Sequence, residues 1–257
     1  MLRPNKPACF NQLRLTGPRI TRIIGSMRLR FVEKKPEVSG VYSFLFEPDL
    51  PAGQAGKKIS WQPGQYLHYE LPHPHSDDRG IERWFTISAA PFEQHVMLTT
   101  RFDGERQSTF KQALFMLEPG TEVEAGEPRG EFLLDPDAAR HILIAGGIGI
   151  TPYRSQLLQL DHDGKQLNAD IMYANRDKNF VFGEQLAELE EKHPEFKIIK
   201  FVGDHRITPK DVEQYLPDEK VIFYLSGPRP LVENYQHMLE ELDVNPNRIR
   251  TDYFPGY

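Results

Sequence analysis

Short β-type segments fill the first half of the chain from residue 28 to about residue 135. Hydrophobic runs, which glycine or proline separates from one another, occur at residues 28–32, 41–46, 65–71, 84–88 and 96–102. Many short strands at this spacing are typical of an antiparallel closed barrel or a sandwich. One helix is expected to interrupt them, from Ser108 to about Leu117, with Ser108 as its N-cap.

The pattern changes after Asp135-Pro136. A short continuous apolar run follows at residues 141–145, and further largely apolar runs occur at residues 169–173, 197–202 and 221–225. Such runs suit the strands of a parallel sheet that is covered on both faces. Helices are predicted between them, at residues 153–160 and 210–216, each behind a Thr-Pro cap, and at residues 230–242. Alternating strands and helices predict an α/β domain.

These patterns divide the chain into a barrel domain at residues 27–137 and an α/β domain at residues 138–257. The remaining segment, residues 1–26, is basic: the first 32 residues hold seven Arg or Lys and no Asp or Glu. Transit peptides are rich in serine, whereas Ser26 is alone here. We interpret residues 1–26 as a dispensable extension, disordered or not native. The alternative is a basic arm that contacts an acidic partner or lipid headgroups.

Composition narrows the function classes. The chain has 257 residues, a net charge of −6 and one cysteine, Cys9. The charge argues against nucleic-acid binding, and one thiol cannot form an internal disulfide or hold an iron–sulfur cluster. We expect no metal site and no membrane-spanning helix, since no run of 18 apolar residues exists. The expected location is the cytoplasm, either free or peripheral to the membrane.

A glycine-rich loop, Ala145-Gly-Gly-Ile-Gly-Ile-Thr-Pro152, follows one buried strand and opens a helix. Glycines allow a tight turn and close approach of a phosphate, and a helix N-terminus adds positive potential. The loop differs from the usual dinucleotide fingerprint because Pro152 takes the place of the third glycine. By itself it is equally a plain strand-to-helix turn. Ser226-Gly-Pro228 follows another buried strand, and two such loops can hold one ligand between them.

Three further segments carry candidate chemistry. In Arg83-Trp-Phe-Thr86, an arginine suited to a diphosphate lies on the same strand face as an aromatic ring. Gly104 to Ser108 precedes a helix N-terminus, and the C-terminal Asp252-Tyr-Phe-Pro-Gly-Tyr257 is rich in aromatic residues. Taken singly, each also has a purely structural interpretation: a surface arginine beside core aromatics, a helix cap, and a tail packed on the barrel.

Together and in this order, the segments resemble the ferredoxin–NADP reductase superfamily over residues 28–257. That resemblance implies an N-terminal antiparallel FAD barrel and a C-terminal nucleotide domain. The matching segments are Arg83–Thr86, Pro63-Gly-Gln65, Gly104 with Ser108, Gly130-Glu-Phe132, Gly146–Pro152 and Ser226–Pro228. Two departures stand out: the Gly104–Ser108 spacing is one residue longer than in the family, and Ser226 replaces a cysteine.

The resemblance also implies roles for single residues. FAD would contact Arg83, Trp84, Phe85, Thr86, Thr100 and Ser108. NADH or NADPH would contact Gly146, Gly147, Gly149, Thr151, Pro152, Gly227 and Pro228. The reacting rings would lie beside Thr86, Ser226 and a terminal aromatic residue, Phe254 or Tyr257. Arg176 is the candidate for a 2′-phosphate, although the neighbouring Asp177 favours NADH, so the donor stays open between NADH and NADPH.

The implied activity is an oxidoreductase that transfers a hydride from NAD(P)H to bound FAD. Electrons would then pass to a separate acceptor such as a ferredoxin, a flavodoxin, an oxygenase component or a membrane redox component. Two alternatives remain at this point. One is a reductase of free flavins or quinones, and the other is a non-catalytic redox-sensing subunit that keeps the fold.

Overall fold

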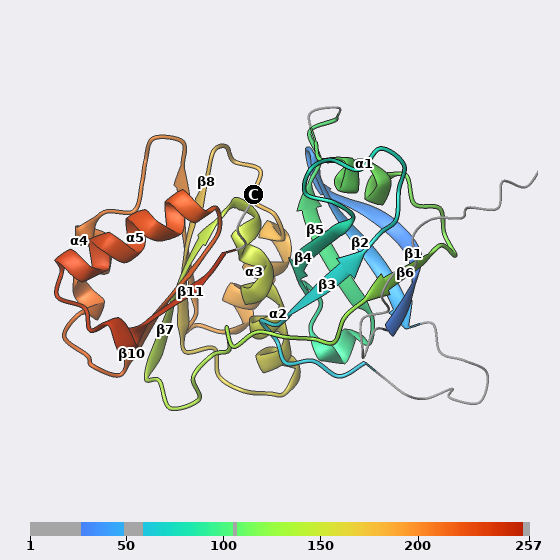
Figure 1. The fold of residues 1–257 in the computed structure, drawn as a ribbon. Helices are drawn as coiled ribbons and strands as arrows, with labels where there is room; N and C mark the ends of the chain where they lie inside the picture. The colour runs from blue at the N-terminus through green and yellow to red at the C-terminus, as the bar shows by residue number, and fades with distance from the viewer. Residues whose placement is uncertain (1–26, 49–58, 105–106, 254–257) are drawn as a thin grey trace, which may run out of the picture.

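The computed structural model describes residues 27–48, 59–104 and 107–253. The extension predicted at residues 1–26 lies outside these ranges. The described chain forms two sheets, one antiparallel and one parallel, which lie side by side in Figure 1. Among the described residues, no helix has both the length and the apolar character needed to cross a bilayer.

The antiparallel sheet has six strands in the order β4-β3-β6-β1-β2-β5. Their bounds are β1 Met27–Val38, β2 Val41–Pro48, β3 Tyr66–Glu70, β4 Glu82–Thr86, β5 Val96–Arg101 and β6 Glu122–Ala125. The two outer strands approach each other where the Ser88 amide, just beyond β4, donates a hydrogen bond to the Met97 carbonyl at 2.8 Å. This contact curls the sheet into the predicted barrel-like form.

Aromatic residues fill the barrel. Phe31 lies with its ring centroid 5.6 Å from that of Phe46 and 6.1 Å from that of Phe44, and all three side chains are buried. Helix α1, Thr109–Phe115, covers one end of this core and buries Phe110. Ser108 is its N-cap as predicted, because its Oγ accepts a hydrogen bond from the Lys111 amide at 3.3 Å. The helix is shorter than the sequence pattern suggested.

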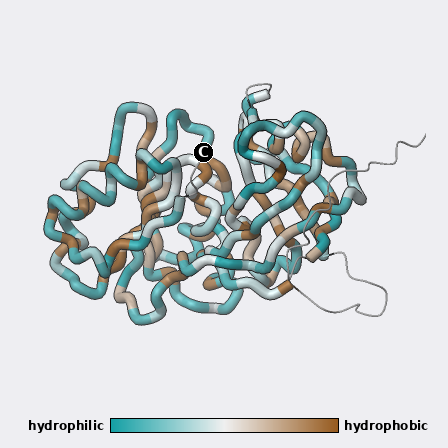
Figure 2. Tube along the Cα trace, viewed as in Figure 1, coloured by the Kyte–Doolittle hydropathy of each residue, from teal (hydrophilic) through white to brown (hydrophobic). Residues whose placement is uncertain are grey.

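The parallel sheet has five strands in the order β11-β10-β7-β8-β9. Their bounds are β7 Arg140–Gly146, β8 Ala169–Asn175, β9 Lys197–Val202, β10 Val221–Ser226 and β11 Ile249–Asp252. Four helices accompany it: α2 Thr151–His162, α3 Gly183–Lys192, α4 Pro209–Val212 and α5 Arg229–Glu241. Figure 2 shows hydrophobic residues along the strands and mostly hydrophilic connecting segments. The predicted fold class is confirmed.

The two faces of the parallel sheet belong to different cores. One face packs with α4 and α5 in a core that includes Ile144, Val212 and Val232. The other face packs with α2 and α3, and its core runs on without a break into the barrel. Phe132, beyond the last barrel strand, contacts Tyr153 of α2 with ring centroids 5.8 Å apart. The barrel and the α/β half therefore share buried side chains, and α2 and α3 lie between them (Figure 1).

Some predicted boundaries need correction. We expected Thr151 to cap a helix beginning at Tyr153, but the N-cap is Ile150 and Thr151 is already helical. The cause is a 3₁₀ turn, Gly147–Ile150, that runs directly into α2. The helix predicted at residues 210–216 ends at Val212 and continues as a 3₁₀ turn.

Two short strands, β6 and β11, were not predicted. The barrel's last strand ends at Ala125 and the first strand of the parallel sheet begins at Arg140. The division into residues 27–137 and 138–257 stays a prediction.

Candidate functional site

A cavity of about 1040 Å³ lies between the barrel and the carboxyl ends of the parallel strands. Small-molecule sites typically span about 300–1,000 Å³, so this one has room for an unusually large ligand or two ligands together. Carboxyl ends of parallel strands are where open α/β sheets bind ligands. The predicted residues that line the cavity are Arg83, Phe85, Thr86, Thr100, Ser108, Gly146, Gly147, Gly149, Thr151, Arg176, Ser226, Gly227 and Pro228.

Strand β4 divides its residues between two faces, as the alternation of a strand requires. Arg83 and Phe85 are buried and line the cavity. Trp84 points the opposite way, is 39% exposed and packs on His68 with ring centroids 4.3 Å apart. The structure does not bring Trp84 into the cavity. The motif supplies an arginine, a ring and a hydroxyl, Thr86, from one side of the site.

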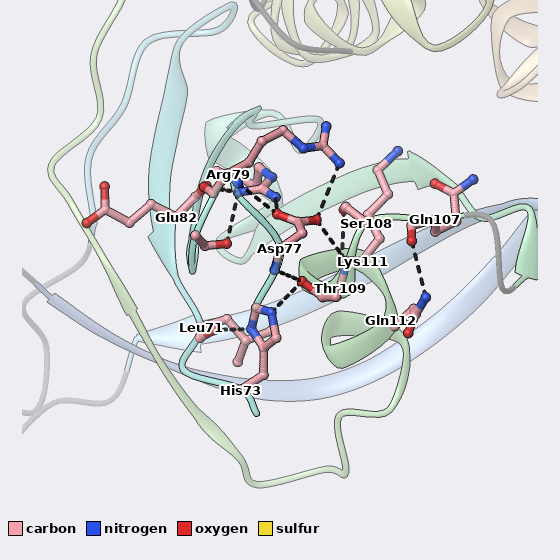
Figure 3. A network of polar contacts seen from close by, with 12 residues as sticks. Leu71, His73, Asp77, Arg79, Glu82, Gln107, Ser108, Thr109, Lys111 and Gln112 are labelled. Carbon is pink, nitrogen blue, oxygen red and sulfur yellow. Dashed lines mark hydrogen bonds and ion pairs between the residues drawn. The ribbon is translucent and has the colours of Figure 1, made fainter. Parts of the chain in front are cut away.

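A polar network holds the Arg83 guanidinium in place, and Figure 3 shows its members Asp77, Arg79, Glu82 and Thr109. Its two terminal nitrogens donate to the carbonyls of Arg79 at 2.8 Å and Glu82 at 2.6 Å, and to Asp77 Oδ1 at 3.1 Å. Asp77 Oδ2 in turn accepts a hydrogen bond from the Thr109 amide at the start of α1. The loop before β4, the strand itself and α1 are thereby joined around one arginine.

The charge state of Asp77 follows from the same contacts. Desolvation works to raise its pKa, but hydrogen bonds from the Thr109 and Arg79 amides and from Arg83 outweigh it and lower the pKa. The carboxylate therefore stays ionised beside Arg83 at neutral pH.

His73 Nε2 reaches the Thr109 hydroxyl at 2.9 Å, so the loop of residues 72–80 folds onto α1.

A second cation, Lys111, lines the barrel side of the cavity and was not predicted. Its Nζ donates to the Arg101 carbonyl at 3.3 Å. Burial, which disfavours the charged ammonium, lowers the pKa of Lys111 to about 8. The barrel thus presents two cationic side chains to the same space, the buried Arg83 and the partly buried Lys111. Nothing in the sequence around Lys111 distinguishes it from the many surface lysines.

The three glycines at the end of β7 and in the loop after it have two different reasons to be glycine. A Cβ on Gly149 would lie 2.1 Å from the Ser226 carbonyl oxygen, and one on Gly146 would lie 2.5 Å from Leu231 Cδ1. These two positions let the β10–α5 loop pack against the β7–α2 loop. Gly147 has a positive φ of 53°, and a Cβ there would meet only Asn175 Oδ1, at 3.9 Å. Gly147 is therefore the glycine whose backbone faces open cavity.

Ser226 and Asp252 end two neighbouring strands at the edge of the cavity. Burial raises the pKa of Asp252 to about 6, although a hydrogen bond with Ser226 acts in the opposite direction. Sequence reasoning missed Asp252 as a site residue because an aspartate in an apparent tail carries no signal of burial. Tyr253 beside it also lines the cavity. Phe254 and Tyr257, the predicted stacking residues, lie outside the described residues.

Cationic side chains border the nucleotide-domain end of the cavity. Arg176 follows β8 and Arg206 follows β9, and both are exposed. Arg229, at the start of α5, pairs with Glu233 at 2.7 Å. Asp177 turns back into its own loop, where Oδ1 accepts a hydrogen bond from the Asn179 amide at 2.8 Å. Pro152, predicted to contact the nucleotide, is buried in α2 and is absent from the described lining of the cavity.

Comparison with known proteins agrees with this arrangement. Residues 143–237 match the family model of the oxidoreductase NAD-binding domain. The described fold is similar to the FAD/NAD-binding domain of a nitric oxide dioxygenase from Vibrio cholerae, with a TM-score of 0.74 and 22% identity over 89% of this chain and 98% of that one. The chain therefore shares the two-domain fold of this FAD/NAD-binding domain.

Further comparisons show how widely the fold is shared. The cytochrome b5 reductase domain of nitrate reductase from Ulva prolifera superposes with a TM-score of 0.75 at 20% identity, over 89% of this chain and 97% of that one. Among curated sequences, a flavohemoprotein from Rhodopirellula baltica is 26% identical over 90% of this chain and 60% of its own length. The chain thus spans about 60% of the length of such relatives.

Proposed function

We propose that the chain is an FAD-dependent NAD(P)H oxidoreductase module that passes electrons to a separate acceptor. The observation that carries the proposal is the pairing of two half-sites across one cavity. On the barrel side are Arg83, Phe85 and Thr86, and on the sheet side are Gly147 and Ser226. The predicted cofactors, FAD and NAD(P)H, are those named for the matching domain and for similar structures.

The residues present fit a flavin dinucleotide on the barrel side. A diphosphate needs cationic groups, and Arg83 and Lys111 supply two. A planar ring needs an apolar face and a hydrogen-bonding edge, and buried Phe85 with the adjacent Thr86 hydroxyl supplies both. When bound, FAD supplies a hydride acceptor that can release electrons one at a time. The barrel residues bind and orient it.

The sheet side fits a pyridine dinucleotide. The positive-φ backbone at Gly147 leaves room for a phosphate, and the N-terminus of α2 begins four residues later. Ser226, Gly227 and Asp252 lie where the two half-sites meet, so their role would be to hold the nicotinamide against the flavin ring. Such positioning can contribute several kcal/mol to lowering the barrier.

The acceptor can be a protein or a small molecule. Similar structures include a phthalate dioxygenase reductase described as carrying electrons from pyridine nucleotides to [2Fe-2S], and a cytochrome P450 reductase from Amycolatopsis. This chain has one cysteine and so cannot hold such a cluster through four thiolates. We therefore place the next electron carrier on another polypeptide or domain.

An acceptor assay distinguishes the proposed function from the competing one, a reductase of free flavins or quinones. NAD(P)H oxidation by FAD-loaded protein would be followed with ferricyanide, cytochrome c, free riboflavin and a soluble quinone, one at a time. The proposal predicts rapid turnover with the one-electron acceptors and retention of FAD throughout. Faster turnover with free riboflavin, together with loss of FAD between turnovers, would contradict it. No turnover with any acceptor would favour a non-catalytic redox-sensing role.

A further inference from the structure

Helix α2 carries polar side chains on the face that it turns toward the barrel. Ser155, Gln159 and His162 recur at helical spacing along this face, and Ser155 and Gln156 are buried. Each contacts the barrel half. Ser155 Oγ donates to the Ala89 carbonyl at 2.7 Å, and Gln159 Oε1 accepts from the Phe92 amide at 3.0 Å. Most buried polar groups in proteins are hydrogen-bonded, and Ser155 Oγ and Gln159 Oε1 meet this requirement through the barrel half.

An ion pair lies at the centre of these contacts. Arg154 donates from both terminal nitrogens to the two Glu93 carboxylate oxygens, at 2.8 and 2.9 Å, and also to the Ser88 carbonyl at 2.8 Å. The exposed fractions of the two side chains are 7% and 17%. Burial alone would raise the pKa of Glu93, but the hydrogen bonds and charge of Arg154 lower it, so both partners stay charged.

Helix α2 contacts the turn at residues 88–93, which follows shortly after β4. Only one residue, Ile87, separates Thr86, which lines the cavity, from Ser88, whose carbonyl accepts a hydrogen bond from Arg154. On the nucleotide side the link to the cavity is equally short, because α2 begins immediately after the Gly147–Ile150 turn. A continuous chain of contacts thus joins the flavin-side strand to the nucleotide-side loop.

Two sequence motifs also serve this interface. A Cβ on Gly64 would lie 2.5 Å from Gln156 Nε2 and 2.2 Å from the Phe132 carbonyl oxygen. Gln156 Nε2 donates to that same carbonyl at 2.6 Å. Gln156 of α2 and the Phe132 carbonyl therefore explain the glycine at position 64 without any ligand, whereas a Cβ on Gly130 would meet Tyr66 Cε1 of the barrel at 2.9 Å.

We propose that the α2 interface, meaning Arg154, Ser155, Gln156 and Gln159 with the 88–93 turn, fixes the distance between the flavin ring and the nicotinamide. Arg154 and Glu93 are its central positioning residues. The expected effect on hydride transfer rests on the proposed function. The expected effect on the distance between the two halves does not. An error of about 1 Å in the placement of reacting groups can reduce a rate about 100-fold.

The first test measures geometry without any reaction. Spin labels on Ser39→Cys and Lys210→Cys, in a Cys9→Ser background, report the distance between the two halves by pulsed electron paramagnetic resonance. Wild-type interface residues should give one narrow distribution, and Arg154→Met should broaden or shift it. Arg140→Met is the matched control, because Arg140 makes a comparable two-pronged pair with Asp170 at 2.9 and 2.7 Å within the parallel sheet. A distribution that is unchanged in Arg154→Met would overturn the proposal.

The second test measures hydride transfer in a single anaerobic turnover of the FAD-loaded protein. Arg154→Met should slow flavin reduction about ten-fold or more at saturating nucleotide, while flavin content and reoxidation by ferricyanide change less than about two-fold. Arg154→Lys keeps the positive charge but not the two-pronged guanidinium. Its rate of flavin reduction should lie between those of wild type and Arg154→Met. An Arg154→Met rate within two-fold of wild type would overturn the positioning role.

Two provisions keep the tests decisive. If Arg154→Met does not fold, Gln159→Leu removes one contact of the same interface and is subject to both measurements. If wild-type protein carries flavin but NAD(P)H does not reduce it, the proposed function fails, and the spin-label distances still judge the interface.

Discussion

Ser226 and Asp252 are paired in register on adjacent parallel strands, and a hydrogen bond joins their side chains at the edge of the cavity. Ser226 is 2% exposed. A carboxyl whose pKa is raised this far by desolvation is found most often at functional sites. The pair also places an ionisable group where the proposed nicotinamide position meets the barrel.

The raised pKa of Asp252 predicts a dependence of stability on pH. An unperturbed aspartate has a pKa near 3.9, and burial raises that of Asp252 to about 6. Between these values the folded protein binds more protons than the unfolded chain, so this group's contribution falls as pH rises through about 6. Asp252→Asn removes the ionisation. Relative to wild type, its free energy of unfolding should increase by up to about 3 kcal/mol between pH 4 and pH 7.

Urea unfolding at a series of pH values measures this difference. Ser226→Ala is the companion variant, since it removes the hydrogen bond that opposes the shift and should move the transition to higher pH. Parallel stability curves for Asp252→Asn and wild type would show that Asp252 does not titrate as described.

The glycine loop offers a matched pair of substitutions. Gly149→Ala puts a methyl group 2.1 Å from the Ser226 carbonyl oxygen, so the β10–α5 loop must move, at a cost of about 3 kcal/mol or more. Gly147→Ala meets open space and costs only the strain of a positive φ, about 1–2 kcal/mol. Thermal and urea unfolding of the two variants should rank them in this order. Equal destabilisation would mean that the two loops are not packed as described.

Flavin binding should depend on the network around Arg83. Arg83→Lys loses the fork that joins Asp77 to the loop carbonyls, and we expect FAD to bind about ten-fold more weakly or worse, roughly 1.4 kcal/mol. Asp77→Asn keeps the arginine but loses its counter-ion, so a smaller loss is expected. Quenching of flavin fluorescence on titration measures both. FAD affinity unchanged in Arg83→Lys would remove Arg83 from the proposed site.

Nucleotide preference should respond to the two exposed arginines after β8 and β9. Arg176 and Arg206 line the same cavity, whereas the carboxylate of Asp177 is bonded within its own loop. We expect Arg206→Gln and Arg176→Gln to reduce kcat/KM for NADPH about ten-fold and to leave the value for NADH nearly unchanged. Steady-state kinetics with both nucleotides measure the ratio. Equal losses for NADH and NADPH would exclude a 2′-phosphate contact.

The fold could be predicted from the sequence because most of its strands have a recognisable apolar pattern. The runs in β7, β8 and β10 are mostly apolar, with Asp170 as an interruption in β8, as is typical of strands covered on both faces. Strands β6 and β11 were missed because each has four residues, too few to establish a period, and half or more of them are polar. The glycine and Arg-x-Phe-Thr motifs led to the cavity, since those residues depend on local backbone shape.

The remaining site residues depend on distant contacts that no local pattern reports. Trp84 was grouped with the flavin site although strand alternation places it on the other face. Asp252 and Lys111 are partly buried only because segments far along the chain pack near them. Nothing in the sequence around Arg154 distinguishes it from a solvent-facing helix residue. Its partner Glu93 belongs to the distant 88–93 turn. Long-range pairing of polar residues is the part of this site that sequence reasoning could not reach.

The central claim is that a flavin held by the barrel lies within reach of a nucleotide held by the α/β half. The most direct measurement is the visible spectrum of FAD-loaded protein during anaerobic addition of NADH and then NADPH, with dithionite as a final control. We predict that the yellow absorbance of oxidised flavin is lost with at least one nucleotide before dithionite is added. A flavin that stays oxidised with both nucleotides and is reduced only by dithionite would contradict the account.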